Sequence, residues 1–267
     1  MSVIALGVEY AGQAFAGWQR QANVATVQGA LEAALSRVAD RAVTVNAAGR
    51  TDRGVHATAQ VASFEIDVDR PLKAWRFGAN AHLPDGVSVV WAQEMDAGFH
   101  ARFSAVARRY LYVWLGEPPG ALAGAQAWAC GTALDPAAMD RAAQVLLGEQ
   151  DFSAVRAAGC QSPTPVRCVH RVRVQRRGDL IVLDIEANAF LLHMVRNIAS
   201  ALQQIGAGRR DADWLTELLA GRDRAPLGPT APPQGLYLVE VRYPETCAVP
   251  PGRLPPLLRT LDGLSAL

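Results

Sequence analysis

The chain has 267 residues, of which 50% are hydrophobic and 19% charged, so it is long enough to bury a sizeable core in one large domain or two lobes. Its formal net charge is +1, which excludes a global basic field, so any nucleic-acid site must be a local basic surface. The cysteines Cys130, Cys160, Cys168 and Cys247 lack CxxC spacing and are interpreted as reduced structural thiols rather than zinc ligands. No apolar stretch approaches the length of a membrane span.

Hydrophobic periodicity predicts a mixture of strands and helices in the first half of the chain. Residues 3–10 form an apolar run typical of a buried strand, and residues 60–67 alternate as a strand does. Thr26 is a suitable cap for a helix that continues to residue 39, and Pro71 fits the first turn of a short helix ending near residue 82. Residues 87–93 are predicted to be another strand.

A second series of elements follows. Residues 109–115 alternate two kinds of hydrophobic residue, which predicts a strand covered on both sides. Asp135 is the expected cap of a helix to about residue 147, and residues 169–175 and 180–187 are predicted to form a hairpin. The apolar spacing of residues 190–205 predicts a long helix, followed by a shorter helix over 211–219 and a final strand over 236–243.

The segment Gly49-Arg50-Thr51-Asp52-Arg53-Gly54 places one carboxylate between two arginines and two glycines. Glycines allow a tight turn and a close approach to a ligand, and arginines bind phosphate and keep a neighbouring aspartate ionised. The local pattern has two interpretations. One is an ordinary polar turn in which Asp52 binds the backbone, and the other is a loop that presents a reactive carboxylate to a nucleic acid.

Further sequence blocks accompany this segment along the chain. They are Glu9-Tyr10-Ala11-Gly12, Phe15-Ala16-Gly17-Trp18-Gln19-Arg20-Gln21, Thr26-Val27-Gln28-Gly29-Ala30-Leu31-Glu32, Phe99-His100-Ala101-Arg102-Phe103-Ser104-Ala105, Arg108-Arg109-Tyr110-Leu111-Tyr112, Asp151-Phe152-Ser153-Ala154, His193-Met194-Val195-Arg196-Asn197-Ile198 and Ala231-Pro232-Pro233-Gln234-Gly235-Leu236.

With these blocks in the family's order, residues 49–57 resemble the active-site motif of the tRNA pseudouridine synthase A family. The resemblance runs from about residue 3 to about residue 244. Two departures stand out: Arg53 replaces a small residue, and Ala199 or Ser200 replaces a glycine. Neither departure removes a chemical group that the reaction needs.

The resemblance implies an α+β protein with the pseudouridine synthase fold, in which two similar α/β lobes share a mainly antiparallel sheet with a central cleft. We expect an N-terminal lobe over residues 1–106, a C-terminal lobe over 107–245 and a tail of unknown role over 246–267. The proline-rich tail is expected to lie exposed on the surface.

The resemblance also implies an activity. The expected reaction isomerises uridine to pseudouridine at positions 38, 39 and 40 in the anticodon stem-loop of tRNA. It needs no metal, redox cofactor or nucleotide cofactor. A cytoplasmic homodimer is expected, with one tRNA touching both subunits.

Asp52 is the implied catalytic nucleophile. An ionised carboxylate can attack C1′ of the ribose, add to C6 of uracil or assist loss of the C2′ proton, and the sequence leaves all three routes open. Arg50 is expected to orient Asp52 and keep it ionised. The resemblance implies that Tyr110 stacks on uracil, with a hydroxyl that could transfer a proton, whereas the residues alone favour a packed strand aromatic. Arg196 is either a partner of Asp52 or a phosphate, or a helix-surface arginine.

The target uridine must be turned out of its stem-loop, and arginines that bind phosphate would offset that cost. The implied substrate-binding residues are Tyr110, Arg53, Arg20, Arg108 and Arg109. A wider pool comprises Arg102, Arg167, Arg171, Arg173, Arg209 and Arg210. His56 is interpreted as a structural hydrogen-bonding residue beside the loop rather than a catalytic base.

Two other functions remain as alternatives. A non-catalytic RNA-binding module or RNA chaperone on the same fold would keep the arginines but would not need Asp52. A glycosidase needs a second, paired carboxylate, and Glu9 and Asp151, which stand in sequence blocks, are interpreted as structural.

Overall fold

The computed structural model describes residues 2–116 and 124–259. The chain divides into two compact units. Unit 1 contains the described residues up to Val106 together with Leu238–Pro255, and unit 2 contains Ala107–Tyr237 and the described residues from Pro256 onward. Residues 238–255, which we expected in the C-terminal lobe and the tail, thus belong with unit 1.

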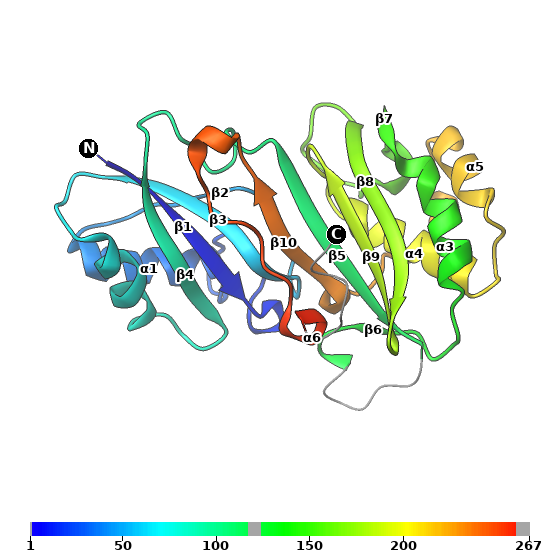
Figure 1. Ribbon diagram of the computed structural model, residues 1–267, viewed down its shortest axis with the longest axis horizontal. Helices are drawn as coiled ribbons and strands as arrows, with labels where there is room; N and C mark the ends of the chain where they lie inside the picture. The colour runs from blue at the N-terminus through cyan, green and yellow to red at the C-terminus, as the bar shows by residue number, and fades with distance from the viewer. Residues whose placement is uncertain (1, 117–123, 260–267) are drawn as a thin grey trace. The chain divides into compact units, whose positions relative to one another are not determined.

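The strand order in unit 1 is β4-β1-β3-β10 (Figure 1). β1 (Ser2–Tyr10) pairs antiparallel with β3 (His56–Ile66) on one side and with β4 (Val87–Met95) on the other. The short β2 (Asn46–Ala47) pairs with β3 and leads into the Asp52 segment. β10 (Leu236–Arg242) neighbours β3, and its residues from Leu238 onward belong to unit 1 although the strand begins in unit 2.

The principal helix of unit 1 is α1 (Val27–Ala39), and both of its ends agree with the prediction. Thr26 Oγ1 accepts the N–H of Gly29 at 3.3 Å, which caps the first turn. The short η1 (Gly12–Ala14) follows β1. Within the helix expected over 71–82, η2 (Ala74–Gly78) is a π-helical turn whose Trp75 packs edge-on against Phe64 of β3, with ring centroids 5.2 Å apart.

The strand order in unit 2 is β5-β9-β8-β7, all antiparallel. These strands are β5 (Ala107–Leu115), β9 (Leu180–Ala187), β8 (Val166–Arg177) and β7 (Gly148–Asp151). The short β6 (Trp128–Ala129) lies parallel to β5. The predicted hairpin is confirmed as β8 and β9, with β8 longer than expected at both ends.

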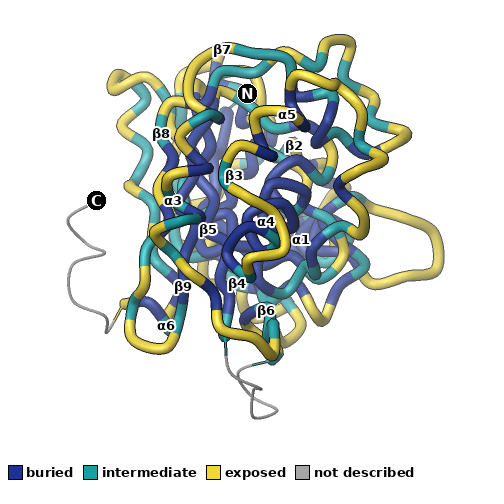
Figure 2. Tube along the Cα trace, turned by 90° about the vertical axis from the view of Figure 1, so that its right-hand side faces the viewer, coloured by how far each residue is buried: buried dark blue, intermediate teal, exposed yellow. Residues whose placement is uncertain are grey.

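Among the described residues, the helices of eight or more residues in unit 2 are α3 (Pro136–Ala143), α4 (Met194–Gly206) and α5 (Trp214–Gly221). Asp135 caps α3 as predicted, since its Oδ1 accepts the N–H of Ala137 at 2.8 Å. α3 contacts β8, α4 contacts β5, and the two helices contact each other, so they cover one face of this sheet. In Figure 2 the tube is dark blue along β5 and α4, which form the buried centre of the unit. Short helical turns complete it: η3 (Gln144–Leu146), η4 (Ser153–Val155), η5 (Ala225–Leu227) and η6 (Pro233–Gly235).

The helix predicted over 190–205 begins four residues late. His193 adopts a left-handed conformation with φ of 59°, which a continuing helix does not allow. The residues directly before the helix instead form a turn, and Phe190, which precedes this turn, packs against Tyr110. The predicted start of α5 is also too early, because the helix begins at Trp214, whose N–H donates to Oδ1 of Asp211 at 2.9 Å.

The tail expected to lie exposed on the surface is partly packed. It contains η7 (Glu245–Cys247) and α6 (Pro256–Arg259). Between them the N–H of Arg253 donates to the carbonyl of Val239 on β10 at 3.1 Å, and the carbonyl of Arg253 accepts the hydroxyl of Thr58 on β3. These bonds hold the segment against unit 1. Residues 260–267 of the predicted tail lie outside the described residues.

The antiparallel strands with helices packed on them confirm the predicted α+β class. Among residues 2–116 and 124–259, none of the helices combines the length and hydropathy that crossing a membrane requires.

Candidate active site

The Asp52 segment is a loop of unit 1 that connects β2 to β3. At its start the N–H of Ala48 donates to the carbonyl of Val61 at 2.8 Å, which extends the pairing with β3. At its end the N–H of Val55 donates to the carbonyl of Asp52 at 3.1 Å, closing a turn that contains Gly54 with φ of 81°. Asp52 is therefore the first residue of a tight turn that needs a glycine at its third position.

Two glycines from the start of the chain let the backbone approach this loop closely. A Cβ on Gly12 would lie 2.0 Å from the carbonyl oxygen of Val55. A Cβ on Gly17, whose φ is 101°, would lie 2.9 Å from the carbonyl oxygen of Thr51. The loop is thus packed backbone against backbone, which fixes its position without any side chain between.

The segment around Gly17 is itself bound on both sides. The N–H of Trp18 donates to the carbonyl of Thr51 at 3.0 Å. On the other side, the N–H groups of Val27 and Gln28 at the start of α1 donate to the carbonyls of Gly17 and Trp18, at 3.2 and 3.0 Å. Helix α1 therefore positions the Asp52 loop through one intervening segment.

A series of hydrogen bonds between buried polar side chains holds the loop in place. The hydroxyls of Tyr10 and Thr51 are 2.8 Å apart, and Gln60 Nε2 donates to the Tyr10 hydroxyl at 3.3 Å and to the carbonyl of Gly49 at 2.6 Å. Burial raises the pKa of Tyr10 to about 12, although the hydrogen bonds from Thr51 and Gln60 oppose the shift. The phenol is neutral near pH 7, so it connects these groups as a hydrogen-bonding hydroxyl.

His56 adjoins the loop, and its contact with Gly12 is of the kind expected of a structural hydrogen-bonding residue. Its side chain is buried, and its Nδ1 accepts the N–H of Gly12 at 3.2 Å. This bond adds to the close contact between Gly12 and the loop.

The three charged side chains of the loop differ in exposure. Asp52 is half-buried, whereas Arg50 and Arg53 are exposed. Within the described part of the chain Arg50 makes no ion pair with Asp52 or any other carboxylate. The expected Arg50–Asp52 pair is therefore not formed in this structure, because the guanidinium points into solvent, where a substrate phosphate could reach it.

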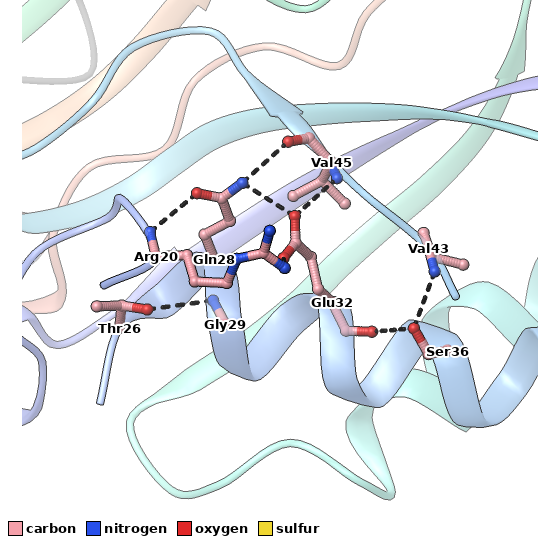
Figure 3. Close-up of polar contacts among 8 residues, drawn as sticks. All are labelled: Arg20, Thr26, Gln28, Gly29, Glu32, Ser36, Val43 and Val45. Carbon is pink, nitrogen blue, oxygen red and sulfur yellow. Dashed lines mark hydrogen bonds and ion pairs between the residues drawn. The ribbon is translucent and has the colours of Figure 1, made fainter. Parts of the chain in front are cut away.

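Arg20 belongs to a polar network on α1 (Figure 3). Its Nη1 donates to Glu32 Oε2 at 2.8 Å, and Glu32 Oε1 accepts from Gln28 Nε2 at 2.9 Å and from the N–H of Val45 at 3.1 Å. Gln28 Oε1 in turn accepts the backbone N–H of Arg20 at 3.0 Å. The side chain of Arg20 is nevertheless 62% exposed. The network therefore holds the guanidinium in place while some of its N–H donors still face solvent.

In unit 2, Tyr110 lies on β5 and is 7% exposed. Its ring meets Phe190 edge-on, with centroids 5.1 Å apart and an interplanar angle of 85°. The late start of α4 thus leaves Phe190 free to fix the orientation of the Tyr110 ring.

Arg109 is not available to RNA, contrary to the expectation. Its Nε and Nη2 each donate to one oxygen of Asp184 at 2.8 Å, and Arg171 also pairs with this fully buried carboxylate. Asp184 stands on β9 between β5 and β8, so the arginines balance a charge within the sheet. Arg108 is also buried, and its Nη1 donates to the carbonyl of Asn188 at 3.0 Å, which makes it a poor phosphate ligand as well.

Arg196 lies on α4 and is half-buried. With Ser200 and Gln204 it forms a row at i, i+4 and i+8 whose side chains donate to the carbonyls of residues 231, 229 and 227, at 2.8, 2.7 and 3.0 Å. The row holds the proline-rich loop that precedes β10. Ser200 therefore contributes a hydrogen bond of its own to this loop.

Sequence reasoning missed the supporting residues around the site. Tyr10 was noted as part of a sequence block and Gln60 as part of a strand, but neither was given a supporting role, although a glutamine within a strand of apolar alternation is a signal of a buried polar contact. Asp184, an acidic residue inside an apolar strand, is the same kind of signal. Among the described residues, no group of three His, Cys, Asp or Glu side chains is arranged to hold a metal ion.

Comparisons with known proteins identify the family of the chain. A family model described as tRNA pseudouridine synthase matches residues 7–104 and 142–244. The proteins named tRNA pseudouridine synthase A of Shewanella frigidimarina and Pasteurella multocida are each 52% identical to the chain over 95% of its length, and the matches cover 98% and 97% of those proteins. The protein of that name from Haemophilus influenzae (strain PittGG) is 50% identical over 98% of the chain and 97% of its own length.

These matches show that the protein is an enzyme, namely an isomerase with the pseudouridine synthase fold. The chain belongs to the tRNA pseudouridine synthase family.

Proposed function

We propose that the protein isomerises uridine to pseudouridine at positions 38, 39 and 40 in the anticodon stem-loop of tRNA, with Asp52 as the catalytic carboxylate. The observation that carries the proposal is the fixed loop of unit 1, which presents Asp52 between the exposed Arg50 and Arg53. The names of the relatives support tRNA as the substrate.

The reaction breaks the bond from C1′ to N1 of uracil and forms a bond from C1′ to C5. The proton on C5 leaves, and N1 gains a proton, so substrate and product are isomers. Asp52 acts in its ionised form, either as nucleophile at C1′ or C6 or as the base for the C2′ proton. A loop held by backbone contacts suits each route, because small displacements of a reacting group strongly reduce the rate.

We assign Tyr110 to the base of the substrate, on which its ring stacks and to which its hydroxyl can transfer a proton. The edge-on contact with Phe190 favours this role, since it holds the ring in one orientation. Arg196 is proposed to bind a substrate phosphate while its Nε keeps the loop before β10 in place.

Exposed arginines are proposed to hold the RNA while the target uridine is turned out, which costs a few kcal/mol. Three arginines of unit 1 suit this role. Two of them, Arg50 and Arg53, lie beside Asp52 in the sequence, and the third is Arg20, which is paired with Glu32. Each would contribute a charge-assisted hydrogen bond to a phosphate. The protein is further proposed to act in the cytoplasm as a homodimer, which would double the basic surface of a chain with net charge +1. Light scattering at micromolar concentration tests the dimer.

The test of the function follows tritium release from unmodified tRNA labelled at uracil C5. Wild-type protein should release tritium, and Asp52→Asn should bind the tRNA but release none. Asp69→Asn removes an exposed carboxylate of the same unit and should behave as wild type. Transcripts that keep a single uridine at position 38, 39 or 40 show which positions react. Binding without release by the wild-type protein would contradict the proposal and favour a non-catalytic RNA-binding protein.

A further inference from the structure

Unit 2 contains a pocket that the proposed catalytic residues do not use. Its volume is about 460 Å³, and its walls are Ser153 at the start of η4, Arg156, residues 157–160 and Arg224. Ala158 and Gly159 are exposed at its rim.

Two arginines bring hydrogen-bond donors into this pocket. Arg156 Nη2 donates to the carbonyls of Cys160 and Ser162, both at 2.7 Å, which closes the loop around the guanidinium. Within the described part of the chain, its Nε and Nη1 make no hydrogen bond. Arg224 Nη2 donates to Thr230 Oγ1 at 2.8 Å, while its Nε is buried without a hydrogen-bond partner among the described residues. Nε of Arg224 has almost no accessible surface, so a ligand in the pocket would meet the other donors of the two guanidinium groups.

The charge in the pocket is positive. The acidic group nearby is Asp151, whose Oδ1 accepts the N–H of Ser153 at 2.8 Å and whose Oδ2 lies 3.5 Å from Nε of Arg222. Arg222 and Arg156 both interact with this carboxylate, and together with Arg224 the three guanidinium groups outnumber it. Guanidinium groups fixed in a partly buried pocket suit an oxyanion, and phosphate in particular.

The wall of the pocket is bound to the segment that holds Tyr110. The N–H of Ala157 donates to the carbonyl of Leu192 at 3.0 Å, and the N–H of Leu192 donates to Sγ of Cys160 at 3.4 Å. Leu192 is two residues from Phe190, whose ring packs on Tyr110. A ligand in the pocket thus lies on the same local framework as the residue that we assign to the uracil base.

We propose that this pocket binds a phosphodiester of the tRNA substrate that lies outside the nucleotide being isomerised. The inference rests on the proposed function for the identity of the RNA, and on the two arginines for the chemistry. The pocket would then be a second binding site for the tRNA, and a phosphate bound there would help to position the tRNA relative to Tyr110.

The test places charge at the rim without disturbing the hydrogen bonds of the walls. Ala158→Glu and Ala158→Lys add side chains of similar length and opposite charge at an exposed position. Dissociation constants for unmodified tRNA are measured by filter retention over a series of KCl concentrations, in the Asp52→Asn background so that no turnover occurs. Arg141→Gln, which removes an exposed arginine from α3 in the same unit, is the matched control.

Ala158→Glu should weaken tRNA binding about ten-fold and reduce the salt slope by about one, as expected for the loss of one phosphate contact. Ala158→Lys should bind as tightly as the parent or more tightly, and Arg156→Gln should resemble Ala158→Glu. The control should change the dissociation constant less than the Glu variant does.

Equal weakening by the Glu and Lys variants would show a steric effect and overturn the proposal, and so would binding that neither variant changes. Tritium release by the wild-type protein is measured alongside. Release together with charge-independent binding refutes the pocket and leaves the proposed function intact. Charge-dependent binding without release refutes the proposed function and leaves the pocket as an RNA phosphate site.

Discussion

Replacing Gly17 with alanine should displace the Asp52 loop and so reduce catalysis more than binding. The new Cβ would lie 2.9 Å from the carbonyl oxygen of Thr51 and 3.1 Å from the backbone nitrogen of Arg53. The φ of 101° is also unfavourable for any residue with a Cβ. Backbone strain of about 1–3 kcal/mol and overpacking of about 1–3 kcal/mol together predict that the free energy of unfolding falls by about 2–6 kcal/mol.

The effect on the rate follows from the size of the displacement. Backbone atoms must move by roughly half an ångström to relieve these contacts, and a displacement of about 1 Å typically reduces a rate about 100-fold. We therefore expect kcat for tritium release at saturating tRNA to fall about ten-fold, with the dissociation constant for tRNA changing little. Single-turnover kinetics and filter retention measure the two quantities, and chemical denaturation measures the stability.

Gly86→Ala is the matched control for this experiment. Gly86 is in the same unit and has φ of 86°, but a Cβ there would meet its nearest atom, Cβ of Ala14, at 3.5 Å, which is ordinary contact. The control shares the backbone strain and lacks the clash with the loop. If Gly17→Ala lowered stability as Gly86→Ala does and left kcat unchanged, the argument that these backbone contacts position Asp52 would be refuted.

Three other predictions concern the supports of the site. Asp184→Asn should lower the free energy of unfolding by about 3–5 kcal/mol in a denaturant titration, because it leaves the buried Arg109 without its counter-charge. The free energy of unfolding should fall as pH rises from 10 to about 12, because the Tyr10 phenol ionises at about pH 10 in the unfolded chain and at about pH 12 in the folded protein. The loss due to Tyr10 should be about 3 kcal/mol. Tyr10→Phe should remove this part of the pH dependence. Ser200→Ala should cost about 1 kcal/mol in thermal unfolding, since it removes the bond to the carbonyl of Pro229.

Each of these expectations has an opposite outcome. An Asp184→Asn protein as stable as the parent would mean that the arginines find other partners. An unchanged alkaline profile in Tyr10→Phe would show that other groups account for the loss of stability above pH 10. A Ser200→Ala variant that unfolds at the parental temperature would mean that water replaces the hydroxyl.

Elements governed by neighbouring residues were predictable. Helix α1 begins after Thr26 and ends at Ala39 as expected, because a hydroxyl cap and apolar spacing are local properties. The β8–β9 hairpin was found for the same reason, since two alternating runs are separated by a turn of two residues. The Asp52 motif was likewise recognisable as a short, continuous pattern.

Properties that depend on distant residues were not predictable. Arg109 adjoins Tyr110 in a block that suggested RNA binding, but its partner is Asp184, 75 residues away. The start of α4 depends on His193 and on the packing of Phe190 against Tyr110, and periodicity alone extended the helix through both. The expected ion pair between Arg50 and Asp52 is not formed although the two residues are close in the sequence, because closeness in the sequence does not set the direction of a side chain.

The sequence by itself determined the family, the α+β class and the identity of the loop that carries Asp52, because motif order and hydrophobic spacing are written in consecutive residues. Only the tertiary structure decided what holds that loop and which arginines are available to a ligand. Gly12 and Gly17 touch the loop from about forty residues earlier in the chain, and Gln60 supports it from β3. Such contacts follow from the close packing of separate segments, in which a backbone atom or a buried carboxylate finds its partner only after the chain has folded.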